Sequence, residues 1–169
     1  QEQYDVNVNL NPQTKESVEF AIKLPGQIEG ETVYLPIDSK FPQEDYERLL
    51  STHETGDKES IELAAKQVEK AIKNEAQKIA EKYILPPTTT DFAIMYLPTE
   101  GLFAEAVRRP GLISFLQSEF HVTIMGPTTL MAFLNSLQMG FRTLAIQKRS
   151  SDVWKVLGAA KSEFQKYRE

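Results

Sequence analysis

The sequence contains no cysteine and only two histidines, and these scarce residue types exclude several kinds of site. Without cysteine there is no disulfide, no thiolate metal site and no catalytic thiol, and the composition fits a reducing compartment. His53 and His121 lie far apart in the sequence and form neither a metal-ligand spacing nor a triad pattern. We therefore expect both histidines to be structural or surface residues.

Long apolar runs are also missing from the sequence. No segment approaches the roughly 20 apolar residues that span a bilayer. The N-terminus lacks the basic and apolar regions of a signal peptide. From these absences we expect a soluble, cytoplasmic chain that makes no membrane contact of its own.

The charge of the chain is unevenly distributed. The 169 residues are 41% hydrophobic, enough for a single domain with a real core, and the net charge of −5 argues against a uniformly basic nucleic-acid binder. Residues 140–169 nevertheless contain seven Lys and Arg against three Asp and Glu. Any polyanion should therefore approach this segment, with Arg142, Lys148 and Arg149 as the candidate binding residues. The alternative is that this basic helix face is only solvated.

One predicted strand ends in an acid and a lysine. Residues 32–42 alternate between two faces, with Val33, Leu35 and Ile37 on one and Tyr34, Asp38 and Lys40 on the other. A carboxylate and an ammonium two residues apart project side by side, which suits holding a divalent cation beside a positive charge. This is the local chemistry of metal-dependent phosphodiester cleavage. The alternative is an exposed ion pair at a strand end.

A second strand, residues 18–24, carries Glu19 on its polar face. A hairpin through the turn-rich segment 25–31 would match the apolar residues of the two strands. The matched pairs are Leu24 with Val33, Ile22 with Leu35 and Phe20 with Ile37. Glu19 then lies opposite Asp38 with β-carbons about 5 Å apart. Two carboxylates that close need a cation or a proton between them.

The remaining periodicities predict the order of the other elements. Alternation predicts a first strand at 4–9, and helical spacing predicts a long helix from Asp57 to about Tyr83. The apolar runs 91–97 and 121–125 predict further strands, the first of them buried on both faces and reached by a crossover. The fold class is therefore α/β, with a mixed central sheet flanked by helices.

The segment after the last predicted strand opens a helix at Gly126-Pro127. Free backbone N–H groups and the hydroxyls of Thr128 and Thr129 can hold a phosphate at such a helix start. The alternative is an ordinary cap with proline in the first turn. Further along, we expect Gly140 to break or kink the helix, and Ser151 or Asp152 to cap a last helix.

Several stretches together resemble the RmuC family of bacterial DNA recombination proteins, and the resemblance runs over nearly the whole chain. The stretches are residues 18–22 with 24–26, 35–42, 91–100, 126–130 and 138–142. The resemblance implies a restriction-endonuclease-like fold and a PD-(D/E)xK nuclease site that acts in recombination and inversion at repeated DNA. It matches Asp38 and Lys40 to the acid-x-Lys pair and Glu19 to the upstream acid, which is often Asp in this nuclease group.

The resemblance also implies a cofactor and a larger protein. Mg²⁺ or Mn²⁺ would be held by Glu19 and Asp38, with DNA as the partner. Family members usually carry an N-terminal membrane segment, a coiled coil and a first core helix ahead of the first strand of this sequence. We therefore expect residues 1–169 to be a single nuclease-like domain excised from a membrane-tethered protein.

Two other functions stay open at this point. The chain could be a non-catalytic module that binds DNA structures on a nuclease scaffold. It could also be an assembly domain that forms a homo-oligomer through its helices. A fold by itself does not choose among these functions.

Overall fold

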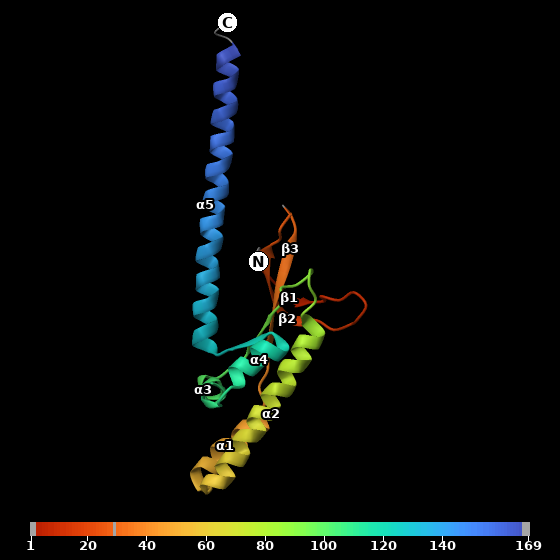
Figure 1. The fold of residues 1–169 in the computed structure, drawn as a ribbon, viewed down its shortest axis with the longest axis vertical. Helices are drawn as coiled ribbons and strands as arrows, with labels where there is room; N and C mark the ends of the chain where they lie inside the picture. Colours follow the sequence, from red (N-terminus) through yellow and green to blue (C-terminus); the bar gives the residue numbers. More distant parts are fainter. Residues whose placement is uncertain (1–2, 29, 167–169) are drawn as a thin grey trace. The chain divides into compact units, whose positions relative to one another are not determined.

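The structure is a computed structural model that describes residues 3–28 and 30–166 (Figure 1). The chain divides into an N-terminal unit that ends at Thr129 and a C-terminal unit that begins at Leu130. Each unit is described by itself. That all residues belong to a single domain stays a prediction.

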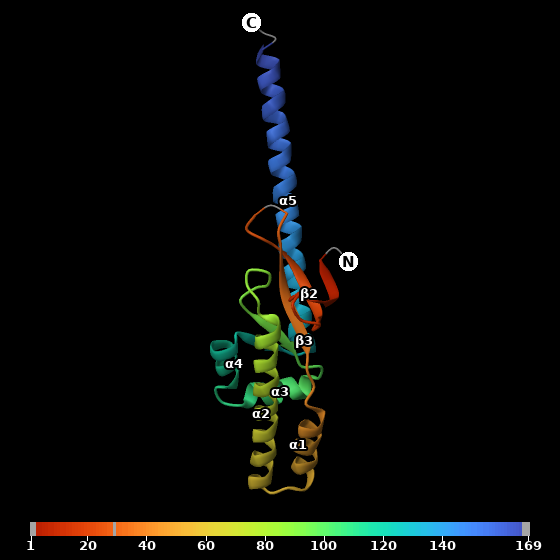
Figure 2. The same cartoon turned by 90° about the vertical axis from the view of Figure 1, so that its right-hand side faces the viewer.

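The N-terminal unit is built on a five-stranded sheet in the order β1-β2-β3-β4-β5. The strands are β1 (Tyr4–Val8), β2 (Val18–Pro25), β3 (Thr32–Ser39), β4 (Ala93–Tyr96) and β5 (Val122–Met125). The first three are antiparallel neighbours, whereas β4 runs parallel to both β3 and β5. Figure 2 shows β2 and β3 next to each other, with α1 lower in the view. The predicted mixed α/β sheet is confirmed.

The register between β2 and β3 is the one that the apolar alternation predicts. Leu24 pairs with Val33, Ile22 with Leu35 and Phe20 with Ile37. The hairpin turn lies in residues 26–31, of which Glu29 is outside the described residues, and is closed by a 2.9 Å bond from the Gly26 N–H to the Glu31 carbonyl. The pairing places Glu19 and Asp38 on the same face of neighbouring strands.

Four helices follow the hairpin or connect the parallel strands. They are α1 (Gln43–Thr55), α2 (Lys58–Tyr83), α3 (Glu100–Arg108) and α4 (Leu112–Phe120). The long helix begins as predicted, because the Asp57 carboxylate accepts a 2.9 Å hydrogen bond from the Ser60 N–H. The α1–α2 pair carries the chain from β3 to the parallel strand β4, so the predicted crossover is confirmed.

These helices pack on one face of the sheet. Met95 and Ile124, from neighbouring strands, belong to the same buried cluster as Leu49 of α1, Ile72 of α2 and Leu116 of α4. Figure 2 shows α1 and α2 lying side by side. Because Asp38 is the register partner of Met95, its side chain projects onto this helix-covered face.

The last helix, α5 (Pro127–Lys166), is continuous over 40 residues. The predicted break at Gly140 and the cap at Ser151 or Asp152 are therefore wrong. A glycine inside a helix costs only about 1 kcal/mol relative to alanine, and the residues on both sides of Gly140 continue the helix. Among the described residues, no helix is long and apolar enough to cross a membrane.

Arg109, directly after α3, ties this helix to α2. Its Nε donates to Glu69 at 3.1 Å, and Nη1 and Nη2 donate to the two carboxylate oxygens of Glu62 at 3.2 and 2.9 Å. The Arg109 side chain is only 14% exposed. We expect Arg109→Ala to lower the free energy of unfolding by about 2 kcal/mol, because charge-assisted bonds at a part-buried site are lost.

Arg108→Ala is the matched control for this substitution. Arg108 is 75% exposed and its ion pair with Glu105 is 3.8 Å long, so its loss should cost less than about 0.5 kcal/mol. Urea unfolding of the two variants measures the difference. Equal effects would show that the Arg109 network does not stabilise the packing of α3 on α2.

Candidate functional site

Asp38 lies at the carboxyl end of β3, where the sheet changes from antiparallel to parallel pairing. The side chain is buried, with the residue only 2% exposed. The chain stays fixed just beyond it, because the Lys40 N–H donates to the Tyr96 carbonyl at 3.0 Å. The site is thus set at the carboxyl ends of parallel strands, where open α/β sheets usually bind ligands.

The Lys40 ammonium lies 2.9 Å from Oδ2 of Asp38. Oδ2 is nevertheless a buried oxygen that receives no hydrogen bond of good geometry among the described residues. Burial raises the pKa of Asp38; contact with Lys40 opposes this shift, and the charges of Glu19 and Glu75 add to it. The sequence alternative of an exposed ion pair is wrong in one respect, since the carboxylate half of the pair is buried.

Burial works to lower the pKa of Lys40, but its net pKa is raised. The contact with the Asp38 carboxylate and the negative charges of Asp38 and Glu75 outweigh the loss of solvent. Lys40 therefore stays charged at neutral pH, and its side chain is 33% exposed. An exposed ammonium beside a buried carboxylate leaves the positive charge accessible to an incoming anion.

Glu19 reaches toward β3 from the neighbouring strand. Its Oε2 accepts a hydrogen bond from the Ser39 N–H at 3.3 Å. The structure therefore brings Glu19, Asp38 and Lys40 together at one sheet edge. Their roles as metal ligands and catalytic lysine stay predictions.

Sequence reasoning missed two residues of α2 at this site. Glu75 contributes negative charge to both Asp38 and Lys40, and it is held by an ion pair with Lys78 at 2.7 Å. Tyr83 has a raised pKa, because it is part-buried and near the Asp38 charge. A signal was available: Glu75 is three residues after Ile72 and four before Ile79, which places it on the buried side of the helix.

The carboxylates of this site suit a hydrated magnesium ion better than a metal ion enclosed entirely by protein ligands. Among the described residues, no three Asp, Glu or His side chains are grouped to hold a metal. Mg²⁺ keeps several waters and uses one or two carboxylates; that Glu19 and Asp38 hold such an ion stays a prediction. The buried Oδ2 of Asp38 is contacted by the Lys40 ammonium at 2.9 Å, so a metal ion would share this oxygen with Lys40.

The predicted phosphate site at the start of α5 has its donors in use. The Thr128 N–H donates to Oε1 of Glu100 at 2.6 Å. The Thr129 hydroxyl accepts from the Gly126 N–H at 2.8 Å and donates to the Gly126 carbonyl at 3.1 Å. A phosphate would have to compete with the Glu100 carboxylate, and phosphate binding here stays a prediction.

The predicted DNA-binding residues belong to the C-terminal unit. Arg142, Lys148 and Arg149 are exposed side chains of α5. Arg142 and Arg149 are seven residues apart, or nearly two helical turns, so they share one side of the helix. The C-terminal unit therefore presents a basic surface, whereas the carboxylates lie in the N-terminal unit.

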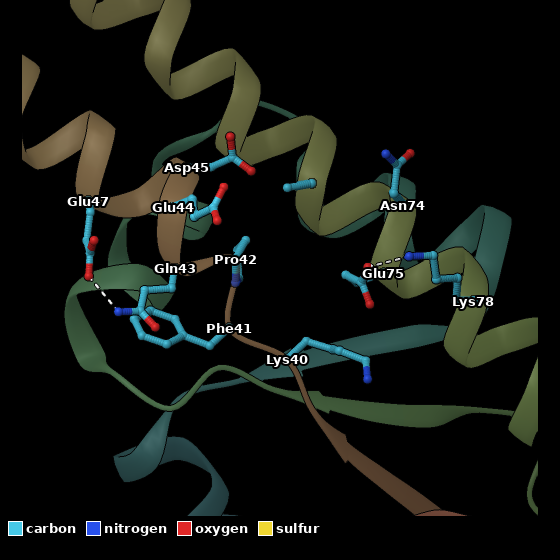
Figure 3. Close-up of a pocket in the computed structure, with 11 residues that line it drawn as sticks. Lys40, Phe41, Pro42, Gln43, Glu44, Asp45, Glu47, Asn74, Glu75 and Lys78 are labelled. Atoms are coloured by element: carbon cyan, nitrogen blue, oxygen red, sulfur yellow. Dashed lines mark hydrogen bonds and ion pairs between the residues drawn. The ribbon is translucent and has the colours of Figure 1, made fainter. Parts of the chain in front are cut away.

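A pocket of about 750 Å³ adjoins Lys40, between the start of α1 and the middle of α2. Figure 3 shows Lys40 and Glu75 reaching into the same space below α2, with Phe41 and Gln43 on the α1 side. No sequence pattern predicts this pocket, because it forms between segments some 30 residues apart. Its position extends the site beyond the charged pair.

The N-terminal unit is a mixed α/β sheet with an acid-x-Lys pair at the end of β3. Comparison with known families then identifies the family of the chain. The model of the RmuC family matches residues 1–169. The chain therefore belongs to the RmuC family.

Two relatives are proteins named DNA recombination protein RmuC homolog, from Xylella fastidiosa strains Temecula1 and 9a5c. Each is 58% identical over 168 residues, covering 99% of this chain and 37% of the relative. The chain thus spans little more than a third of the length of these relatives. No solved structure matches the chain, so the restriction-endonuclease-like part of the fold stays a prediction.

The Glu100 contact at the start of α5 predicts a pH-dependent stability. The hydrogen bonds from Thr128 lower the pKa of Glu100 below its usual value. A lowered carboxyl pKa stabilises the fold above the unfolded pKa of about 4.3, and that contribution is lost as pH falls through the folded pKa. We therefore expect Glu100→Gln to lower the Tm at pH 7 and to have little effect at pH 2 to 3.

Glu119→Gln is the control, since Glu119 is an exposed glutamate of α4. Melting curves between pH 2 and 7 for both variants and the wild type measure the effect. A Glu100→Gln penalty that is the same at every pH would contradict a charge-dependent cap.

Proposed function

We propose that this chain carries the site of a metal-dependent DNA endonuclease of the PD-(D/E)xK type, in a DNA recombination protein that limits rearrangement at repeated DNA. The observation that supports it is the buried Asp38 carboxylate, which lies 2.9 Å from the Lys40 ammonium and beside Glu19. Burial of an acid next to a second acid costs stability. Perturbed carboxyls of this kind cluster at functional sites.

In this proposal Glu19 and Asp38 hold Mg²⁺ or Mn²⁺ through hard oxygen ligands. Bound there, the ion would polarise the scissile phosphate and lower the pKa of an attacking water. Asp38 is held rigidly by its strand, and Glu19 is anchored by the Ser39 N–H. Lys40 stays charged and offsets negative charge on the phosphoryl oxygens as the transition state forms.

DNA as the substrate is supported by the names of the relatives and by the basic side chains of α5. A site built from carboxylates repels phosphate, so other residues have to bind the DNA backbone. Arg142, Lys148 and Arg149 are assigned this role. Their contacts would position the strand without reading its sequence.

One observation favours a second candidate, assembly through α5. The helix exposes a group of large apolar side chains near its middle and end: Val153, Trp154, Val156 and Leu157, each at least 54% exposed. Exposed apolar groups of this size often mark an interface. A homo-oligomer that forms without DNA would support this function, and it is compatible with a nuclease site in the N-terminal unit.

Substitution of Asp38 separates metal binding from a structural ion pair. We expect millimolar Mg²⁺ to raise the Tm of the wild type but not of Asp38→Asn, because the variant loses an anionic ligand. Without metal, the raised pKa of Asp38 means that its stabilising contribution is lost as pH rises through the folded pKa. Asp38→Asn should therefore gain stability relative to the wild type as pH rises to neutrality.

Two further variants complete this test. Lys40→Ala should keep the Mg²⁺-dependent rise in Tm but lose roughly 100-fold or more of any cleavage rate, since it removes charge stabilisation and not a ligand. Asp91→Asn, at an exposed aspartate outside the site, should behave as the wild type. Identical metal responses of the wild type and Asp38→Asn would remove Asp38 from the ligand set.

The salt dependence of DNA binding tests the basic residues of α5. We expect replacement of Arg142, Lys148 and Arg149 by Ala to weaken binding at low salt. It should also flatten the slope of log affinity against log salt by roughly 0.7 to 0.9 for each lost phosphate contact. The control replaces three exposed lysines of α2, namely Lys58, Lys66 and Lys70. A slope that the α5 substitutions leave unchanged would exclude these residues from the interface.

A further inference from the structure

The pocket beside Lys40 has a chemistry different from that of the carboxylate pair. Its volume of about 750 Å³ lies within the range of small-molecule sites, roughly 300 to 1,000 Å³. Its lining includes an aromatic ring, amides and carboxylates besides two lysines. Figure 3 shows these groups around one space bounded by α1, α2 and the segment that leaves β3.

The aromatic ring is Phe41, which directly follows Lys40. It is 41% exposed, unusually open for a phenylalanine. Its ring centroid lies 6.2 Å from that of Tyr46 at an interplanar angle of 57°. This tilted contact holds the ring while much of its surface stays accessible. Such an exposed ring can stack against a planar ligand.

The polar groups of the pocket suit a neutral ligand that carries N–H groups. Gln43 donates through Nε2 to Glu47 at 2.7 Å, which fixes its amide and leaves the Oε1 acceptor available. The Glu44 carboxylate makes no hydrogen bond or ion pair in the described part of the chain. Asn74 adds a further amide from α2. Carboxylate and amide oxygens accept hydrogen bonds from the amino groups of nucleobases.

The same carboxylates exclude a phosphate from the pocket. Of the charged groups lining it, Glu44, Asp45, Glu47 and Glu75 are acidic, whereas only Lys40 and Lys78 are basic. Phosphate would thus be repelled from the interior and attracted to the Lys40 edge. A ligand with a planar, neutral part and an anionic part matches this division, and a nucleotide within a strand has both parts.

We propose that this pocket receives an unstacked nucleobase of single-stranded DNA, whose backbone passes Lys40; this deepens the proposed function and rests on it. The base stacks on Phe41 and its edge hydrogen-bonds to Glu44, Gln43 or Asn74. Bases within a duplex are stacked and paired, so an unpaired strand enters at lower cost. The site therefore selects single-stranded or locally unpaired DNA as its substrate class.

The test measures binding without Mg²⁺ or Mn²⁺, so that it does not depend on cleavage. The probes are a short fluorescent single strand, the same strand with abasic sugars throughout, and the corresponding duplex. We expect the wild type to bind the base-containing strand most tightly. Phe41→Ala should weaken that binding roughly 5- to 100-fold, the range for loss of one base stack, and should leave binding of the abasic strand unchanged.

Two variants control for a general effect on the fold. Phe41→Leu keeps an apolar side chain but has no aromatic face, so it should lose binding as Phe41→Ala does. It replaces Phe41→Ala in the test if the alanine variant is unstable. Phe115→Ala removes a phenylalanine of similar exposure, 37%, from α4 outside the pocket and should bind like the wild type. Melting temperatures of all variants are measured alongside.

Each contrary result overturns a defined part of the proposal. Equal losses for the base-containing and abasic strands, or no loss for either, would overturn the base pocket while leaving the proposed nuclease untouched. Competition by deoxyadenosine monophosphate at concentrations at which the strand itself binds would identify a free nucleotide as the ligand. A wild type that binds none of the DNA probes without metal would overturn this inference, whereas the Mg²⁺-dependent rise in Tm tests the proposed function separately.

Discussion

The site depends on the register between β2 and β3. Because side chains alternate along a strand, a slip of one residue would move Asp38 from the helix-covered face to the other face. A slip of two would keep the face but place Glu19 beside a different residue. The observed pairs, from Leu24 with Val33 to Phe20 with Ile37, allow neither slip. The charged chemistry at the strand end thus follows from apolar matching in the middle of the hairpin.

Burial of the Asp38 carboxylate lowers the stability of the fold, and other interactions have to offset this loss. Its register partner on β4, Met95, is fully buried. Contact with Lys40 reduces the cost, while Glu19 and Glu75 increase it. A sequence under selection for stability only would place an apolar residue here. An acid buried at a position where an apolar residue would be more stable is therefore a sign of function.

The strands and their register could be predicted because both follow from alternation within short segments. Three features could not. Gly140 was expected to interrupt α5, but one glycine does not outweigh forty helical residues. Phe20 alternates with the apolar set of β2 and yet is 46% exposed, because exposure depends on what covers the sheet. The spacing of Glu75 places it on the buried side of α2, but its approach to Asp38 depends on how α2 packs across the sheet, which helical periodicity does not determine.

Short sequence patterns do not determine which elements pack over them. The acid-x-Lys pattern therefore indicates where a site lies but does not identify its substrate. Asp38, Lys40 and Phe41 are consecutive or nearly so, and chain connectivity alone keeps an acid, a cation and an aromatic ring within one short segment. What turns this segment into a site is the arrival of α1 and α2 over it, which buries the acid and leaves the ring facing a cavity. Lys40 belongs to both the acid-x-Lys pair and the pocket: it pairs with Asp38 and also lines the pocket. In the function proposed above, a ligand that uses both the acid-x-Lys pair and the pocket carries its negative charge at Lys40 and its planar part beyond it, so this one ammonium group would link recognition to cleavage.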